Sequence, residues 1–362
     1  MNTEDIQGGR EVYDSYMNYT VLDYSQSTLP SVLADSEDSF ENMAKVVSAI
    51  MYTIAFVCGV TGNALVLWNI GFKLKKTVTL IYILNLALSD FILTALLPFS
   101  IINTALDYHW PFGTFMCKFL DFVAHLNMFA NVFLLMLVSS DRYISIVHPV
   151  WAQNHRSLQK SILVCVLVWS VAIAFSIPFA IIRETQTINL GSDLIVCYSK
   201  PDKGLFGDNR NNKVTEASVR FVIAFLIPFI TIAFCYGAIL VKLKHKWTRP
   251  SRKPFKVITA VVIAFFICWL PYHILNIIKT FPEYSDSAYT LSFLAKSLAY
   301  FNSCINPILF IMAGRGLITE LAKKMKDALQ GLLQEEMGRR QSKSEKQSST
   351  TEEVSCIKTD KA

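Results

Sequence analysis

Seven apolar blocks separated by polar loops follow one another along the chain. About twenty consecutive apolar residues cross the hydrocarbon core of a membrane as a helix. The strands of membrane barrels are about ten residues long and alternate in polarity. These blocks are longer and do not alternate in polarity. The pattern therefore predicts an all-α membrane protein, a seven-transmembrane helix bundle. The blocks cover roughly residues 46–70, 78–103, 115–140, 160–182, 219–241, 257–279 and 288–312.

The composition supports a membrane protein and excludes several other classes. The chain of 362 residues is 52% hydrophobic and 17% charged, which is too apolar for an ordinary soluble surface. We find no internal repeat of the kind that many transporters contain. We also find no zinc-ligand spacing, no phosphate-binding glycine loop and no nucleophile elbow. We therefore expect neither an enzyme nor a protein with a resident cofactor.

The charged loops predict how the bundle is oriented. The loop 242–256 holds seven Lys and Arg residues, and the loops 71–77 and 141–160 are also basic, whereas the tail 1–41 holds nine acids against one base. Because positive loops face the cytoplasm, we expect a multi-pass plasma-membrane protein with its N-terminus outside. The net charge of +6 fits a basic surface against membrane lipids and does not indicate nucleic-acid binding.

The polarity of the chain also predicts its division into parts. We expect an extracellular acidic tail over residues 1–45 and the seven-transmembrane domain over 46–313. Residues 314–330 are amphipathic, which is typical of a short cytoplasmic helix on the inner leaflet. Residues 331–362 are polar and predict a disordered cytoplasmic tail. This tail offers sites for phosphorylation at Ser342, Ser344, Ser348, Ser349, Thr350 and Thr351.

The outer face carries two candidate modification sites. Asn18 opens the sequon Asn18-Tyr19-Thr20, which predicts glycosylation on the outer tail. The tyrosines among the acidic residues of this tail are candidate sulfation sites. An acidic tail that is only solvated is an equal alternative. Cys117 and Cys197 are the cysteines that fall at the outer face. Because the exterior is oxidising, we expect these two cysteines to form a disulfide bond.

Polar residues inside the apolar blocks indicate a functional site within the membrane. An ionisable residue within a span is costly and points to function, and Asp90 is such a residue in the second block. The pair Asn127 and Asn131 shares one helix face, and the seventh block holds Ser303 and Asn306. We expect these residues to meet in one wet cavity. Oxygen ligands with one carboxylate suit a sodium ion, and a hydrogen-bond network with water is the compatible alternative.

Short motifs occur in order through the whole set of blocks. They are Gly62-Asn63, "LNLALSD", Trp110 with Cys117, Asp141-Arg142-Tyr143, Trp169, Pro228 with Tyr236, Cys268-Trp269-Leu270-Pro271 and Asn306-Pro307. One such motif is weak, but the ordered set is specific, and it resembles that of the rhodopsin-like (class A) G-protein-coupled receptors. A closer resemblance, through "KKTV", "DYHW" and "HPVWAQNHR", is to the chemoattractant peptide receptor branch. Receptors similar to the chemerin receptor fit best, and formyl-peptide, anaphylatoxin-like and prostaglandin D2-type relatives are the alternatives.

The resemblance implies a cell-surface receptor for a chemoattractant, in the first place a chemerin-like or formyl-peptide-like peptide. It implies signalling through a heterotrimeric G protein of the inhibitory class, with calcium release and chemotaxis in inflammation. Receptor kinases and arrestin are further implied partners. Two alternatives stay open: a receptor for a lipid mediator or an anaphylatoxin, and an arrestin-biased scavenging receptor. A seven-span channel would need a polar path through both leaflets, which we do not find.

The candidate G-protein coupling site is the triplet Asp141, Arg142 and Tyr143. Arg142 ends an apolar helix face at the membrane boundary, where a guanidinium can pair with a neighbouring carboxylate. The resemblance implies that Asp141 holds Arg142 in the resting state. Movement of the sixth helix would then release Arg142 and open a cleft for the G protein.

The candidate activation switch lies in the sixth and seventh blocks. Phe265 and Trp269 share one face just before Pro271, whose missing N–H kinks the helix. The resemblance adds Asn306 and Pro307 of the seventh block to this switch. Bulky aromatic side chains at a hinge can transmit ligand contact through changed packing.

The sequence departs from the family pattern at two of these positions. The family's tyrosine four residues after Asn306 is Phe310 here, and the family's serine near the sodium site is Asn131. In relatives this tyrosine approaches a tyrosine of the fifth block, which is Tyr236 in this chain. The first departure puts an active-state polar link in doubt, and the second bears on ion binding.

Two bases near the outer ends of their blocks are the candidate ligand contacts. Arg220 precedes the fifth-block proline by about two turns, and Lys296 precedes Asn306 by nearly three. Relatives of this branch place a base at the Arg220 position for an acidic group on the ligand. The nearest acids are Asp121 in the third block and Glu184 at the end of the fourth. The open alternative is that Arg220 and Lys296 neutralise these acids or extend outward to water. The full predicted ligand-binding set is Arg220, Lys296, Asp121, His125, Glu184 and Tyr272.

Overall fold

The computed structural model describes residues 31–189, 193–199, 209–244, 252–281 and 286–313. The predicted glycosylation site at Asn18, the phosphorylation sites of the C-terminal tail and the amphipathic helix at 314–330 lie outside these residues. The chain divides into two compact units, Met1–Phe310 and Ile311–Ala362. All contacts given below lie within the first unit.

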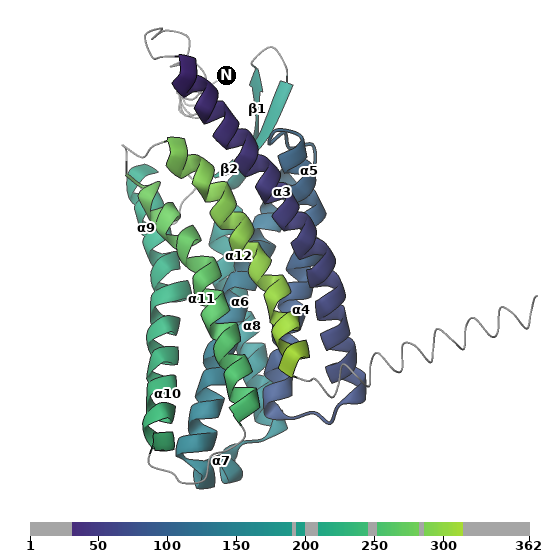
Figure 1. Cartoon of the computed structure of the whole chain (residues 1–362), viewed down its shortest axis with the longest axis vertical. Helices are drawn as coiled ribbons and strands as arrows, with labels where there is room; N and C mark the ends of the chain where they lie inside the picture. The colour runs from purple at the N-terminus through teal and green to yellow at the C-terminus, as the bar shows by residue number, and fades with distance from the viewer. Residues whose placement is uncertain (1–30, 190–192, 200–208, 245–251, 282–285, 314–362) are drawn as a thin grey trace, which may run out of the picture. The chain divides into compact units, whose positions relative to one another are not determined.

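The described part of the chain is a helix bundle with one short hairpin (Figure 1). The bundle confirms the predicted fold class, and each apolar block forms a helix or a pair of helices. The fifth block contains a π-helical turn at Val222–Leu226. The elements in chain order are α3 (Ser31–Trp68), α4 (Val78–Ala95), α5 (Leu97–Ala105), α6 (Gly113–Val147), α7 (Pro149–His155), α8 (Leu158–Ile181), β1 (Arg183–Asn189), β2 (Asp193–Ser199), α9 (Asn209–Phe221), α10 (Ile227–Lys244), α11 (Arg252–Ile278) and α12 (Asp286–Ala313).

The starts of two helices follow from local capping. The side-chain oxygen of Thr77 accepts a hydrogen bond from the N–H of Leu80 at the start of α4. Ser157 does the same for the N–H of Lys160 at the start of α8. A hydroxyl at this position satisfies a backbone donor that the helix itself leaves unpaired. These caps explain why both helices begin close to the predicted limits of their blocks.

The first helix begins earlier than its apolar block. α3 starts at Ser31 and so extends into the region expected as the N-terminal tail. Lys45 forms ion pairs with Glu41, one turn earlier on α3, at 3.0 Å and with Asp107, which follows α5, at 3.3 Å. Pairs four residues apart stabilise a helix, so charged contacts extend α3 beyond the residues that apolar periodicity predicts.

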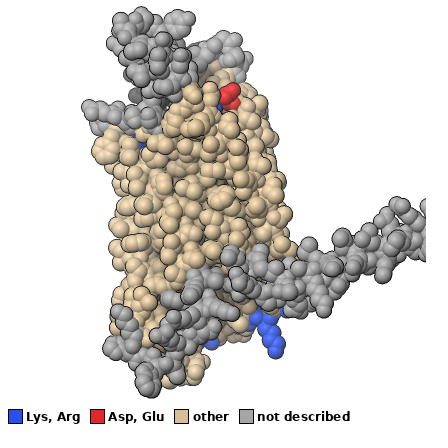
Figure 2. Space-filling view, in the orientation of Figure 1, with Lys and Arg blue, Asp and Glu red and all other residues tan. Residues whose placement is uncertain are grey.

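The surface of the bundle is apolar over its middle. Six helical segments among the described residues are long and apolar enough to cross a membrane. α12, with 28 residues, supplies the seventh span, and its buried polar residues reduce its apolar character. Figure 2 shows no Lys, Arg, Asp or Glu across the middle of the visible face. Large apolar side chains such as Ile267 are 62% exposed, which is unfavourable in water but suits contact with lipid. The protein is therefore a multi-pass membrane protein.

Close approach of α3 to α12 depends on a glycine and a proline. A Cβ atom added at Gly62 would lie 2.8 Å from Cγ of Pro307, so no larger residue fits there without movement. Pro307 lacks an N–H and leaves the carbonyl of Ser303 without its helical partner. The Asn63 side-chain amide donates to this carbonyl at 2.9 Å and to Gly59 O at 2.9 Å. The contact therefore satisfies a buried carbonyl and fixes the position of the α12 kink.

Candidate functional site

A β-hairpin covers one end of the bundle, which we call the hairpin end. β1 and β2 pair antiparallel, with Thr185 opposite Cys197. Cys197 forms a disulfide bond with Cys117 at the start of α6, with a Cα–Cα distance of 5.8 Å, so the predicted disulfide is confirmed. Trp110 donates its backbone N–H to the carbonyl of Ile195 at 2.7 Å. The hairpin is thus attached to the bundle both covalently and through its backbone.

A cavity of about 760 Å³ is lined by both strands of the hairpin and by helices of the bundle. Its aromatic lining includes Phe129, Phe179, Trp269, Tyr272 and Tyr300. A concave site with an apolar lining and a few converging polar groups is typical of a ligand pocket. The charged lining residues are Asp121, Arg183, Glu216, Arg220, Lys279 and Lys296.

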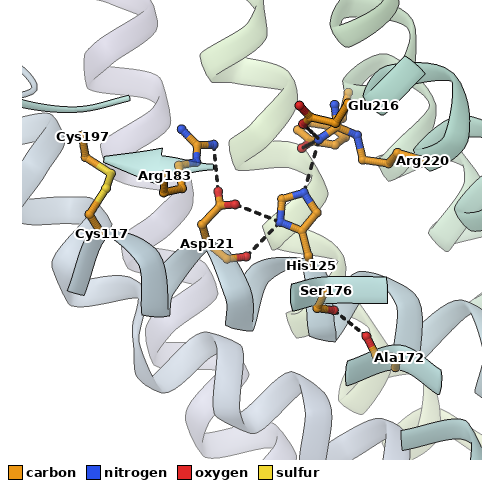
Figure 3. A network of polar contacts seen from close by, with 10 residues as sticks. Cys117, Asp121, His125, Ala172, Ser176, Arg183, Cys197, Glu216 and Arg220 are labelled. Carbon is orange, nitrogen blue, oxygen red and sulfur yellow. Dashed lines mark hydrogen bonds and ion pairs between the residues drawn. A yellow bond between two sulfur atoms is a disulfide. The ribbon is translucent and has the colours of Figure 1, made fainter. Parts of the chain in front are cut away.

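A continuous chain of polar contacts crosses this cavity (Figure 3). Arg183 of β1 binds the Asp121 carboxylate at 2.8 Å, and the other oxygen of Asp121 lies 3.2 Å from Nδ1 of His125. Nε2 of His125 lies 3.2 Å from the Arg220 guanidinium, which also pairs with Glu216 at 3.6 Å. Because arginine can only donate, His125 accepts through Nε2 and carries its proton on Nδ1. The chain thereby holds Arg220 in a defined position.

Arg220 is the central cation of this chain. Its side chain is largely enclosed, with a residue exposure of 6%. It donates to the Tyr272 hydroxyl at 3.3 Å and lies 5.4 Å from the ring centroids of Phe179 and Tyr272. A guanidinium with aromatic rings around it and one neighbouring carboxylate is desolvated but still able to bind an anion. This is the geometry that a ligand carboxylate would need.

The structure places five of the predicted ligand-binding residues at the cavity and corrects one. Glu184 lies on β1, not at the end of the fourth helix, and pairs with Lys118 at 3.7 Å. The idea that Arg220 neutralises Asp121 or Glu184 is also wrong, because its carboxylate partner is Glu216. The confirmed lining residues are Arg220, Lys296, Asp121, His125 and Tyr272.

Sequence reasoning missed three charged residues of the cavity. Glu216 and Arg220 are one helical turn apart, so the spacing of four residues could have revealed this pair. Arg183 and Lys279 carry no such local signal. Burial alone would lower the pKa of Arg183, but attraction to Asp121 outweighs it and raises that pKa. The buried carboxylate thus keeps the β1 guanidinium charged.

The cavity reaches the predicted activation switch, because Trp269 of α11 is one of its lining residues. Trp269 lines the cavity and packs on Phe265, with ring centroids 5.9 Å apart. Its ring also meets Tyr272 edge-on at 5.6 Å. Phe265 is fully buried in the main apolar core, where side chains of α6 and α10 pack. A ligand that contacts Trp269 would therefore act directly on the packing at the α11 proline.

The structure brings the residues of the predicted polar cluster around Asp90 together. Its carboxylate accepts hydrogen bonds from the side-chain amides of Asn127 at 3.0 Å, Asn131 at 2.6 Å and Asn306 at 2.8 Å. Ser303 is fully buried beside them. The three amide oxygens are buried and have no hydrogen-bond partner among the described residues. Carboxylate and neutral oxygens are the ligands that a hard cation takes, so this donor set fits the expected sodium ion.

Arg142 lies at the end of the bundle opposite the hairpin. The prediction that Asp141 holds Arg142 is wrong. Asp141 binds Arg156, which follows α7, through two contacts of 2.6 and 2.8 Å. Arg142 instead donates to the Thr79 hydroxyl on α4 at 2.8 Å. A guanidinium and a carboxylate in bidentate geometry make the strongest pair available, so Arg156 takes Asp141 and leaves Arg142 to Thr79. Tyr143 packs against Phe234 of α10, at 5.8 Å between centroids.

Comparison with known proteins decides which family has this arrangement. Residues 62–310 match the family described as 7 transmembrane receptor (rhodopsin family). The chain belongs to this family. It is 39% identical to the C3a anaphylatoxin chemotactic receptor of Danio rerio over 295 residues, which cover 81% of this chain and 79% of the relative. It is 38% identical to the Chemerin-like receptor 2 of Mus musculus, covering 84% of each. It is 35% identical to the N-formyl peptide receptor 2 of Pongo pygmaeus, covering 83% and 89%.

Membership of the rhodopsin family confirms the resemblance that the motifs indicated. The protein is a G-protein-coupled receptor and not an enzyme. Its relatives include the chemerin-like and formyl-peptide receptors that the sequence favoured, and also an anaphylatoxin receptor, which the sequence left as an alternative. An agonist on one side of the membrane and a G protein on the other are the partners that this family implies.

One family position carries a prediction of its own. In this rhodopsin-family receptor Phe310 and Tyr236 pack against the same apolar core, and a phenyl ring cannot donate to a tyrosine. Phe310→Tyr is expected to restore an active-state hydrogen bond worth about 0.5–1.5 kcal/mol and so to raise basal or maximal G-protein activation. Nucleotide exchange in membranes measures both. Phe310→Leu is the control and should raise neither; an unchanged Phe310→Tyr receptor would mean that packing compensates.

Proposed function

We propose that this receptor binds a chemoattractant peptide with a free carboxylate in the cavity below the hairpin. The observation that carries the proposal is the enclosed Arg220, positioned by His125 and Tyr272 on one wall of a peptide-sized cavity. The names of the relatives, which point to peptide and anaphylatoxin ligands, support the same ligand class.

The proposed signal leaves through the inhibitory class of G proteins, with calcium release and chemotaxis. The hairpin end faces the exterior of the plasma membrane, as does the N-terminus. A disulfide bond at this end supports that orientation, because disulfides persist in oxidising compartments. Arg142 then lies at the cytoplasmic end, where the G protein binds. Receptor kinases and arrestin act on the C-terminal tail, whose serines and threonines suit them.

A sodium ion is the proposed allosteric partner of the Asp90 cluster. Asp90 is fully buried, so a cation there would offset a carboxylate that water does not reach. Asp90, Asn131 and Ser303 would hold the ion, with Asn127 and Asn306 beside them. The ion would link the cavity above to the α12 proline below, because Asn306 binds Asp90 directly.

A panel of chemoattractant peptides and lipid mediators tests the proposed function. Cells that express the receptor should release calcium and lower cyclic AMP with at least one acidic peptide. Pertussis toxin should remove both responses if the inhibitory class carries the signal. A response to lipid mediators alone would contradict the peptide assignment. Arrestin recruitment without calcium or cyclic AMP signals would instead assign a scavenging receptor.

Arg220→Ala is expected to weaken an active free-acid peptide by about 10- to 150-fold. A charge-assisted hydrogen bond to a carboxylate is worth about 1.5–3 kcal/mol, and this factor is its equivalent in affinity. Competition binding measures the change. The same peptide amidated at its C-terminus should already bind weakly and lose little more in the mutant.

Lys118→Ala is a matched control, because Lys118 pairs with Glu184 and does not line the cavity. It should leave both peptide forms unchanged. Equal losses of the acid and amide forms in Arg220→Ala would assign Arg220 to structure, not to carboxylate binding.

A further inference from the structure

Two arginines meet at one hydroxyl group at the end of the bundle opposite the hairpin. The Thr79 hydroxyl accepts a hydrogen bond from Arg142 at 2.8 Å and another from Arg156 at 3.1 Å. The same hydroxyl donates to the Asp141 carboxylate at 3.3 Å. Like charges in one place repel each other, and this single carboxylate offsets that repulsion. The two arginines therefore compete for Asp141.

Arg156 holds Asp141 in the stronger geometry. Its Nε and one terminal nitrogen lie 2.6 and 2.8 Å from the two carboxylate oxygens. The side chain of Asp141 is 8% exposed and that of Arg156 is 34% exposed, so water screens this ion pair only in part. A bidentate pair is stronger and more directional than a single contact. Arg156 thus uses both oxygens of the carboxylate that follows Ser140 in α6.

The position of Arg156 is fixed by the ends of two helices. Its backbone N–H donates to the carbonyl of Ala152 at 3.0 Å, which closes the last turn of α7. The next residue, Ser157, caps the start of α8. Arg156 and Ser157 are all that separates the two helices. The guanidinium therefore reaches Asp141 from a defined backbone position.

Arg142 is left with one neutral partner. Among the described residues its side chain makes a single hydrogen bond, to Thr79, and its buried Nε makes none. A buried donor without an acceptor costs free energy, so Arg142 would gain from acceptors that a docking protein brings. A direct pair with Asp141 would remove much of this gain, because charge-assisted hydrogen bonds are roughly twice as strong as neutral ones.

We propose that Arg156 is a positioning residue for G-protein coupling. By occupying Asp141, it keeps Arg142 on a weak neutral contact from which a G protein can take it. Without Arg156, the adjacent carboxylate would capture Arg142 and stabilise the resting state. The inference rests on the proposed function, which gives Arg142 the contact with the G protein.

Binding of a nucleotide-free G protein tests this role without any ligand. The purified full-length receptor in lipid nanodiscs is titrated, in the presence of apyrase, with one purified heterotrimer of each Gα class. The heterotrimer that binds the unmodified receptor most tightly is used for the variants. Arg156→Ala should weaken its affinity by about 5-fold, the factor between a charged and a neutral partner for Arg142. Arg156→Lys keeps a cation beside Asp141 and should retain most of the affinity.

A second substitution distinguishes positioning from support of the fold. In the Arg156→Ala background, Asp141→Asn removes the carboxylate that would capture Arg142 and should restore the affinity to within about 2-fold of the unmodified receptor. If Arg156 only supports the fold, a second lost charge cannot restore binding. Lys160→Ala, which removes an exposed base in the first turn of α8, is the control and should bind normally. Thermal unfolding midpoints show that each variant is folded.

Three results would overturn the role of Arg156. They are unchanged or tighter binding in Arg156→Ala, no recovery in the double variant, and a loss in Arg156→Lys as large as in Arg156→Ala. Failure of the proposed function has a different signature. Normal binding in Arg142→Ala would remove the coupling role of Arg142, and no binding of any heterotrimer by the unmodified receptor would refute both proposals. Loss of binding in Arg142→Ala with normal binding in Arg156→Ala would refute the role of Arg156 alone.

Discussion

Arg142→Ala is expected to abolish ligand-stimulated nucleotide exchange on the G protein, while ligand binding largely survives. Arg142 lies at the end of the bundle opposite the hairpin, and its guanidinium is held by Thr79 at 2.8 Å. Arg142 is half-buried, and in the proposed mechanism it contacts the G protein once α11 has moved outward. Alanine removes every donor of this contact, whereas the ligand cavity, lined by residues of the hairpin end, keeps all of its groups.

Two further variants separate this role from a general loss of charge. Thr79→Val removes the acceptor that holds Arg142 and should raise basal exchange, because the resting contact is weakened. Lys160→Ala removes an exposed base at the start of α8 and should change nothing. Exchange of labelled GTP analogue in membranes, with radioligand binding on the same samples, measures both properties. Normal stimulated exchange in Arg142→Ala would refute the role.

Cys117→Ser or Cys197→Ser is expected to cause the second large effect, a loss of surface expression or of ligand affinity. The bond joins residues 80 positions apart, and removal of a native disulfide typically costs about 2–5 kcal/mol. In this receptor it also joins β2 to the start of α6, so its loss frees the strand pair that carries Arg183. Arg183 holds Asp121, and through His125 the same chain reaches Arg220.

Surface labelling of intact cells and saturation binding measure this loss. Cys58→Ala is the control, because Cys58 is a free cysteine of α3 with no such constraint. Its expression and affinity should match those of the unmodified receptor. Labelling of both Cys117 and Cys197 by a thiol reagent in the folded, unreduced protein would show that the bond does not form.

Local spacing made parts of this receptor predictable. Runs of apolar residues long enough to span a bilayer predicted the helices, because each spanning segment must satisfy its backbone hydrogen bonds internally. A spacing of four residues placed Asn127 and Asn131 on one face, and their polarity indicated the partner Asp90. The Cys117–Cys197 bond could be predicted because these two cysteines fell at the oxidising outer face. The remaining cysteines fell inside spans or in the C-terminal tail.

Local spacing was least informative where charged side chains choose among several partners. Asp141 and Arg142 are adjacent in sequence, yet consecutive helix positions point in different directions. Asp141 therefore meets Arg156, beyond α7, and Arg142 meets Thr79 on α4. The loop after the fourth block was expected only to be constrained by a disulfide, and its fold as a hairpin is what brings Arg183 to Asp121.

The sequence by itself determined the class of this protein, its spans, its disulfide and the membership of its polar cluster. These depend on hydrophobic length, residue type and helical period, all of which act over a few neighbouring residues. Only the tertiary structure decided which acid balances which base in the cavity. That choice depends on how each helix is rotated and where each loop returns, and it leaves Arg220 positioned by His125 and Lys296 without a carboxylate partner among the described residues.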